Sequence, residues 1–316
     1  MGWLDVVKRD PVPWLLDPVN PSARYLTLRD IFRRPPSALQ AEQEAILRWA
    51  PIQALIRQTD SVSFWGRGEN PYFGGPMSNF GTFSMLAQTG VPPFPLALKV
   101  GEHLLDKGRR PAGQFAPPGL GPVTWLCYTG MALQALWHFG LGEDPRAQSA
   151  KAYLVEAVLQ DAPTLVCGLS GNVCAWGLVK ALGGLLGIPP AQRTADDQAA
   201  IEQLARRLLE HPFDFQGRNA DWLQLRFPRY YEADILELCH VLSHSIAPQH
   251  PGFRSYLHRA IALQNPAGRW VKRHSVSGYA EDIEALHRPS RWLTWEAVHT
   301  LMLVYGGNTY DSTEKR

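Results

Sequence analysis

The stretch TWLCYTGMALQALWHF, at residues 124–139, carries small, apolar and aromatic side chains on nearly every face of a helix. A helix that is apolar all round is buried all round, so this stretch predicts an inner helix of a large helical domain. A different pattern fills residues 198–211, where Ile201, Leu204 and Leu208 form an apolar stripe opposite a charged face. This second pattern is typical of an outer helix with one face on the core and the other in water.

The two patterns alternate along the chain. Segments that are apolar on nearly every face cover residues 25–32, 81–89, 124–139, 172–186, 230–246 and 290–305. Amphipathic segments cover residues 39–58, 95–107, 145–160, 198–211 and 253–264. Alternation with a period of about 50 residues predicts an all-α fold, an (α/α)6 toroid of about six helical hairpins in two concentric rings around a central cavity.

The two ends of the chain carry similar segments. PSARYLTL at residues 21–28 resembles PSRWLTW at residues 289–295, and in both the serine after proline can cap the free backbone N–H groups of a helix start. Matching first and last repeats predict a ring that closes on itself. We expect residues 1–316 to form one toroid domain, with residues 1–19 as an N-terminal extension and residues 306–316 as a flexible C-terminal tail.

Composition limits the classes of function. Of the 316 residues, 45% are hydrophobic and 19% charged, which is enough to bury a large core. The formal net charge of +2 comes without a Lys/Arg block and argues against nucleic acid as a partner. No apolar run approaches about 18 residues, so no membrane span is expected. The start of the chain lacks a signal-peptide pattern and the cysteines are too few for a disulfide scaffold, so we expect a cytoplasmic protein, of open oligomeric state.

Three segments carry a resemblance to a known family. They are NPSARYLTLRD at residues 20–30, FPRYYEADILE at residues 227–237, and GRW at residues 268–270 followed by RPSRWLT at residues 288–294. They resemble bacterial proteins of the prenyltransferase and squalene-oxidase repeat superfamily, and the likeness runs over nearly the whole chain. The resemblance implies the terpenoid-cyclase type of toroid with a central apolar cavity.

The chain departs from the catalytic patterns of those families. Squalene-cyclase-like enzymes use an Asp-x-Asp-Asp acid, whereas the string at residues 194–197, TADD, lacks the first Asp and lies where a helix should begin. The zinc ligands of protein prenyltransferases have no counterpart that we can assign. Bacterial relatives often carry a histidine between two cysteines, where this chain has Asn172 between Cys167 and Cys174.

Asp234 is a carboxylate in an otherwise apolar segment, where an unpaired charge would be costly to bury. Desolvation would raise its pKa and make it a general acid, so it is the first catalytic candidate. The alternative is a salt bridge to Arg229 or Arg24 that ties helices together.

Aromatic residues of the expected inner ring are candidates for the cavity wall. Tyr231 and Tyr128 are catalytic candidates, together with Cys174. The substrate-binding candidates are Trp125, Trp176, Tyr230, Trp292, Trp295 and Cys127. Aromatic faces can stabilise a carbocation, although an aromatic stripe is equally consistent with a filled core.

Cys167 and Cys174 are weak candidates for a zinc site, with Cys239 and His240 as partners, and zinc is the one cofactor considered. The alternative is that the cysteines pack among small residues as structural thiols.

The remaining candidate functional residues are histidines and one glutamate. Glu296 and His299 share a helix face, where they can orient a proton donor or form packing hydrogen bonds. His138, His240 and His244 match no metal-binding motif and are expected to be ordinary helix-face histidines.

The sequence supports three hypotheses about function. The first is a terpenoid-cyclase- or prenyltransferase-like enzyme that binds an apolar small molecule of isoprenoid type and starts its chemistry with Asp234 as acid. The second is a lyase or hydratase acting on a terpenoid alcohol or a carbohydrate, with Cys127, Cys174 and Tyr128 at the site. The third is a non-catalytic toroid that binds a lipid, a peptide or a partner protein. An acid and several aromatics around a pocket favour an enzyme, whereas a filled centre favours binding.

Overall fold

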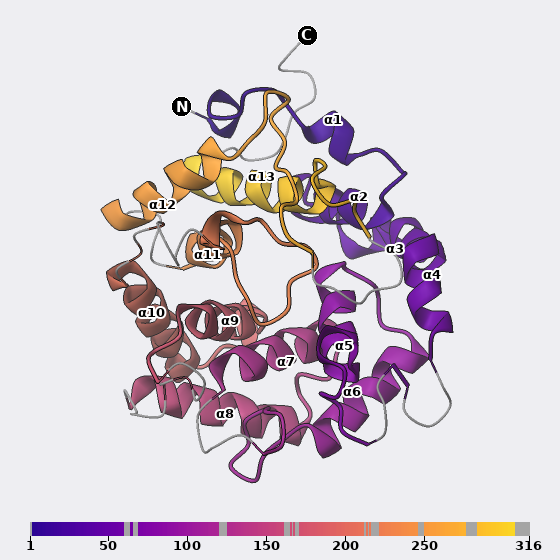
Figure 1. Cartoon of the computed structure of the whole chain (residues 1–316), viewed down its shortest axis with the longest axis vertical. Helices are drawn as coiled ribbons and strands as arrows, with labels where there is room; N and C mark the ends of the chain where they lie inside the picture. Colours follow the sequence, from indigo (N-terminus) through magenta and orange to yellow (C-terminus); the bar gives the residue numbers. More distant parts are fainter. Residues whose placement is uncertain are drawn as a thin grey trace.

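Helices arranged around a common centre make up the described part of the chain in the computed structural model (Figure 1). The structure describes residues 2–59, 64–65, 69–119, 125–160, 165, 167, 171–211, 213, 215, 221–245, 250–275 and 283–306. Extended segments within these ranges form isolated bridges, such as the one between Gln264 and Trp270, and no named strand. Nor does any helix in the described ranges have the length and apolar character needed to cross a bilayer.

The inner helices are buried on nearly every face. They are α2 (Pro21–Leu26) with the π-helical turn Thr27–Ile31, α5 (Asn79–Gln88), α7 (Leu126–His138), α9 (Ala175–Leu186), α11 (Ile235–Ser243) and α13 (Arg291–Tyr305). In α5, for example, every residue from Asn79 to Leu86 is buried. The burial follows from side chains that are apolar or small on all sides of the helix.

The outer helices bury one face only. They are α3 (Gln40–Arg48), α4 (Ala50–Arg57), α6 (Pro95–Lys107), α8 (Pro145–Leu159), α10 (Ala195–Glu210) and α12 (Pro251–Ala262), and 3-10 turns lie at Pro36–Ala38, Gly75–Met77 and Pro190–Gln192. In α10 the buried stripe contains Ile201, Leu204 and Leu208, as predicted. Figure 1 shows α5, α7, α9, α11 and α13 nearer the centre than α4, α6, α8, α10 and α12. The all-α toroid predicted from the alternating patterns is confirmed.

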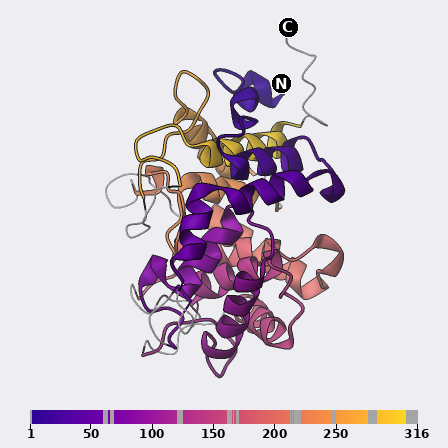
Figure 2. The same ribbon diagram turned by 90° about the vertical axis from the view of Figure 1, so that its right-hand side faces the viewer.

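The last helix closes the ring against the first elements. α13 packs against α2, against α1 (Val12–Leu15) and against the 3-10 turn Trp3–Asp5, and the indigo and yellow segments lie together in both views (Figures 1 and 2). Arg291 at the start of α13 pairs with Asp17 at 3.1 Å, and its guanidinium lies 4.4 Å from the ring centroid of Trp14. The stretch expected as an N-terminal extension therefore packs on the closing helix.

The two matching segments start their helices differently. Ser290 Oγ accepts a hydrogen bond from the N–H of Leu293 at 3.0 Å and caps α13, as predicted. At α2 the cap is Asn20, whose Oδ1 accepts from the N–H of Ala23 at 2.9 Å. Ser22 instead donates to the carbonyl of Thr89 at 2.6 Å. The predicted cap at Ser22 is wrong because the helix begins one residue before it, at Pro21.

The acidic string at residues 194–197 is a helix start. Thr194 and Asp197 form a reciprocal capping box at the beginning of α10. Asp197 also binds Lys151 of α8 at 3.1 Å. These contacts support the structural interpretation of the string over a catalytic one.

α7 and α9 touch backbone to backbone, because glycines lie where they cross. A Cβ placed on Gly130 would lie 2.1 Å from the carbonyl oxygen of Lys180, and one on Gly184 would lie 2.5 Å from the carbonyl oxygen of Gly130. Both distances are far inside van der Waals contact. The two inner helices can approach this closely only while both positions lack a side chain.

Alanine at Gly130 should lower the free energy of unfolding by about 2–3 kcal/mol, because α7 and α9 must move apart to admit the methyl group. Gly183→Ala is the matched control. Its Cβ would meet its nearest neighbour, Val241, at 3.6 Å, so this change should be neutral or stabilise by up to about 1 kcal/mol through helix propensity. Urea denaturation of both variants measures the difference, and equal stabilities would contradict the close crossing.

Candidate functional site in the centre of the ring

A cavity of about 390 Å³ lies among the inner helices. This volume is within the range of roughly 300–1,000 Å³ that is usual for small-molecule sites. The side chains with polar groups or indole rings on its wall are Arg29, Gln88, Gln134, His138, Arg229, Glu237, His240 and Glu296, with Trp137, Trp292 and Trp295. The expectation of an apolar cavity therefore needs correction, since charged groups share the wall with aromatic rings.

Arg229 binds two carboxylates from different parts of the ring. Its Nη2 and Nε donate to Asp234 at 2.8 and 3.1 Å, and its Nη1 and Nη2 donate to the two oxygens of Glu296 at 2.6 Å each. The three side chains are at most 3% exposed. Charge-assisted bonds of this geometry join the start of α11 to α13.

The position of Arg229 is fixed by its neighbours. The amide of Gln88, at the end of α5, donates to the Arg229 carbonyl at 2.8 Å and accepts from the Arg229 N–H at 3.0 Å. The Trp292 ring centroid lies 5.0 Å from the guanidinium carbon, and its indole N–H donates to the Gln88 carbonyl at 2.8 Å. Gln88 thus holds the backbone of Arg229, while Trp292 packs on its guanidinium at the cavity wall.

Buried carboxylates outnumber buried cations around the cavity. Lys180 of α9 donates to both oxygens of Glu237 of α11 at 2.7 and 2.8 Å and is itself 4% exposed. With Arg229 included, two cations face three carboxylates, those of Asp234, Glu237 and Glu296. The surplus negative charge lies in surroundings of low dielectric constant, which favours the binding of one proton.

Glu296 is the carboxyl that takes this proton. Asp234 accepts hydrogen bonds from Arg229 and from three backbone N–H groups, whereas Glu296 accepts from Arg229. Burial raises the pKa of Glu296 to about 7, the charges of Asp234 and Glu237 act in the same direction, and Arg229 opposes them. The group is therefore partly protonated near neutral pH.

Asp234 has a structural role that occupies both of its oxygens. It is the N-cap of α11 and accepts from the N–H groups of Leu236 and Glu237 at 3.0 and 3.1 Å, in addition to binding Arg229. It is fully buried and does not line the cavity. The salt bridge considered as the alternative is thus observed, and Glu296 replaces Asp234 as the first candidate for an acid.

The predicted aromatic residues fall into two groups. Trp292 and Trp295 line the cavity beside Glu296. Tyr128 belongs to a second cluster, with its ring centroid 5.9 Å from those of Trp125 and Tyr230 and its hydroxyl 3.4 Å from that of Tyr230. This cluster gathers at the starts of the inner helices rather than on the cavity wall.

Tyr231 and Trp176 extend the second cluster. Their ring centroids are 6.2 Å apart, and Tyr231 is 38% exposed. Neither lines the cavity. The structure therefore separates these candidates from Glu296.

Cys127 and Cys174 lie beside the second cluster as protonated thiols. Burial raises the pKa of Cys127 to about 12 and also raises the pKa of Cys174, with neighbouring thiols acting in the same direction. A protonated thiol is a poor nucleophile. Cys239 is fully buried in α11, and within the described ranges no cysteine belongs to a group of three close ligand atoms. Cys167 and Cys174, the weak zinc candidates, lie within hydrogen-bonding distance of each other, without a third ligand atom from the described residues.

Sequence reasoning missed Lys180 and Glu237. A signal for Lys180 was present, because it is a lysine inside an apolar segment, the same anomaly that pointed to Asp234. Its partner lies 57 residues away, and no local pattern links the two positions.

Replacing Arg229 with methionine should lower the free energy of unfolding by about 3–5 kcal/mol, because two buried carboxylates would lose their partner. Adding Glu296→Gln should restore part of the loss, since it removes one of those charges. Arg146→Met is the control, because Arg146 pairs with exposed acids and should cost less than about 1 kcal/mol. Chemical denaturation at neutral pH measures the stability of all three variants. A similar loss in the control would contradict a larger contribution of the buried ion pairs to stability.

No protein-family model matches the chain, and no curated protein matches it in sequence. Among solved structures, it is similar to the type II terpene cyclase MstE from Scytonema in complex with merosterolic acid A, with 14% identity, coverage of 91% of this chain and 98% of that chain, and a TM-score of 0.32. It is also similar to an unsaturated glucuronyl hydrolase specific for heparin, with 14% identity, coverage of 90% of this chain and 85% of that chain, and a TM-score of 0.42. Both TM-scores are below 0.5, so neither likeness bears on the function of this chain.

Proposed function

We propose that this chain is an enzyme that donates a proton to a small hydroxylated substrate in the central cavity, with Glu296 as the general acid. The observation that carries the proposal is a buried carboxyl on the cavity wall, within a cluster in which three carboxylates face two cations. A carboxyl that keeps its proton near neutral pH meets the requirement for general acid catalysis.

The polar lining supports a hydroxylated ligand. Arg29, Gln134 and Glu237 bring guanidinium, amide and carboxylate groups to the wall. A hydrocarbon ligand would leave such groups facing apolar surface, which is costly in a buried site. An alcohol or a carbohydrate offers hydroxyls to them, while the tryptophans of the wall offer flat apolar faces.

Elimination or hydration fits these residues. Glu296 gives its proton to a hydroxyl or ether oxygen as the C–O bond breaks, and water or an alcohol leaves. A proton then departs from the neighbouring carbon as the double bond forms, and Glu237 is the second carboxylate on the wall that can accept it. Hydration is the reverse sequence. The reaction class is that of a lyase or a hydratase.

A cyclase acting on an isoprenoid is the second candidate. Trp137, Trp292 and Trp295 line the cavity, and their ring faces would stabilise a carbocation. A carboxyl whose pKa is raised to about 7 is a weaker acid than an ordinary one, however. It suits protonation of an oxygen leaving group better than protonation of a carbon–carbon double bond.

Glu296→Gln should remove one contribution to the pH dependence of stability. The folded pKa of about 7 lies above the ordinary value of 4.5, so the folded chain binds this proton more tightly than the unfolded chain. The resulting stability is fully present below pH 4.5 and is lost as the pH rises through about 7. Compared with the variant, wild type should lose stability across this window in urea denaturation at a series of pH values. Parallel pH profiles would show that Glu296 is not protonated.

Turnover can be tested on prenyl alcohols, para-nitrophenyl glycosides and unsaturated uronic acids, with products followed by mass spectrometry. We expect turnover of a hydroxylated member, falling as the pH rises above about 7. Glu296→Gln should lower kcat by about 10²–10⁴-fold. Glu210→Gln, at an exposed glutamate of α10, should leave it unchanged. Turnover of unsubstituted polyprenes alone would favour the cyclase.

A further inference from the structure

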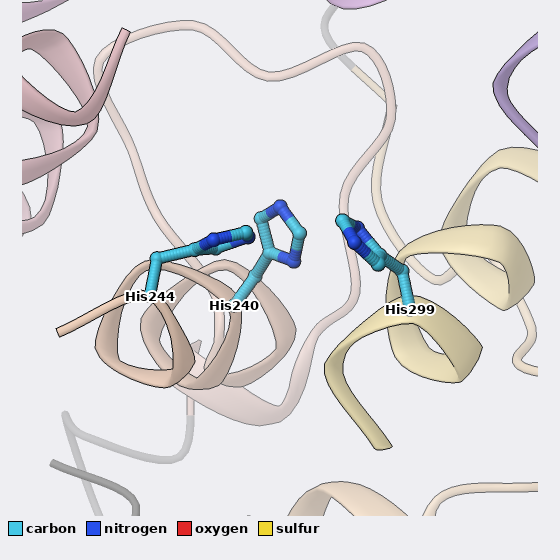
Figure 3. Close-up of side chains that lie close together, drawn as sticks. All are labelled: His240, His244 and His299. Atoms are coloured by element: carbon cyan, nitrogen blue, oxygen red, sulfur yellow. The ribbon is translucent and has the colours of Figure 1, made fainter. Parts of the chain in front are cut away.

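Three histidines meet at the edge of the central cavity. His240 lies on α11, His244 follows one turn later at the end of that helix, and His299 lies on α13 (Figure 3). One ligand nitrogen from each lies within 4.8 Å of the others. The ring centroids are 4.9, 5.3 and 5.4 Å apart, and Figure 3 shows the His240 ring between the other two.

We propose that His240, His244 and His299 bind a divalent transition metal ion, with zinc as the first choice. Three imidazoles with a fourth position open are a ligand set that suits zinc. Zinc–nitrogen bonds of about 2.0–2.1 Å place tetrahedral ligand atoms about 3.3 Å apart. Side-chain rotation can supply the remaining approach, since His244 is exposed.

Thr300 determines which nitrogen of His240 is available. The Thr300 hydroxyl donates to the carbonyl of Glu296 at 2.8 Å, so its oxygen accepts from Nδ1–H of His240 at 3.1 Å. With the proton on Nδ1, the lone pair on Nε2 is left for a metal ion. Hydrogen bonds of this kind orient metal-binding histidines in general.

His299 supplies an independent observation. Its Nδ1 is buried, and no hydrogen-bond partner for it is found in the described part of the chain. Buried polar atoms nearly always have a partner, and an ion is one of the explanations for such an exception. Trp295 packs along the ring, with centroids 6.0 Å apart and an interplanar angle of 27°, which limits how the imidazole can turn.

The surroundings carry charges of both signs: Asp30 favours a cation at His244 and His299, whereas Arg29, Arg33 and Arg193 oppose one. The histidines lie toward the C-terminal end of α11, where free carbonyl groups carry partial negative charge. Arg29, which shares the cavity wall with His240, is paired with Asp30 at 2.7 Å. This ion pair reduces the repulsion between the guanidinium and a bound metal ion.

The proposed metal site adjoins the central cavity. His240 lines the same cavity as Glu296, so an oxygen ligand on the metal, from water or from a hydroxyl, would share that space. The inference does not depend on the proposed reaction, because metal binding is measured without a substrate.

Metal binding to the full chain, prepared without a histidine tag and stripped with a chelator, tests the inference. Added zinc should be retained at about one ion per chain by elemental analysis, and cobalt(II) should develop the visible absorption of a low-coordinate site. His244→Ala and His299→Ala should each weaken zinc binding by at least about 10-fold. His258→Ala, at an exposed histidine of α12, should bind as wild type does.

Thermal unfolding separates loss of binding from loss of folding. Zinc should raise the Tm of wild type and of His258→Ala by several degrees and leave that of His244→Ala unchanged. Without metal, His244→Ala should melt as wild type does, because the side chain is exposed. The inference is overturned if wild type retains no zinc, if the variants at His244 and His299 bind normally, or if Cys174→Ser abolishes binding instead.

Discussion

The neutralisation of Arg229 at the centre of the ring is the constraint on which the rest of the site depends. A guanidinium that is buried between helices must meet carboxylates, and here these are the N-cap of α11, Asp234, and the cavity residue Glu296. The backbone of Arg229 is held by Gln88 from a third helix. These directed polar bonds join α5 and α13 to the segment that precedes α11.

The charge balance of the cluster links this structural role to chemistry. Asp234 accepts hydrogen bonds from the Arg229 guanidinium and from three backbone N–H groups, and Glu237 is paired with Lys180, so the surplus charge falls on Glu296. Glu296, which ties α13 to Arg229, is therefore also the carboxyl whose pKa is raised. Under the proposed function, stability and reactivity would arise from the same charge imbalance, since a fully paired cluster would contain no group ready to donate a proton.

The polar cavity and the aromatic cluster are built from different residues of the inner helices. Trp125 and Cys174 are the N-caps of α7 and α9, and Tyr128 and Trp176 follow in the first turns. The cavity, by contrast, draws on the last turns of α5 and α7, on α11 from Glu237 to Val241 and on the first turns of α13. His240 lies on this wall as well. Aromatic residues that look alike in sequence are thus divided between the cavity wall and the second cluster.

The sequence by itself determined the helical alternation, the order of inner and outer layers and the meeting of the two ends, because burial on all faces or on one face is written in local periodicity. It also exposed Asp234 as a buried charge that requires a partner. Only the tertiary structure decided which charges pair, since Arg229 and Glu296 are 67 residues apart and no local pattern joins them. It likewise gathered His240, His244 and His299, which appear in sequence as unrelated helix-face residues. The physical reason is that periodicity specifies how much of a helix is buried, whereas the composition of a cavity depends on the rotation and height at which neighbouring helices meet.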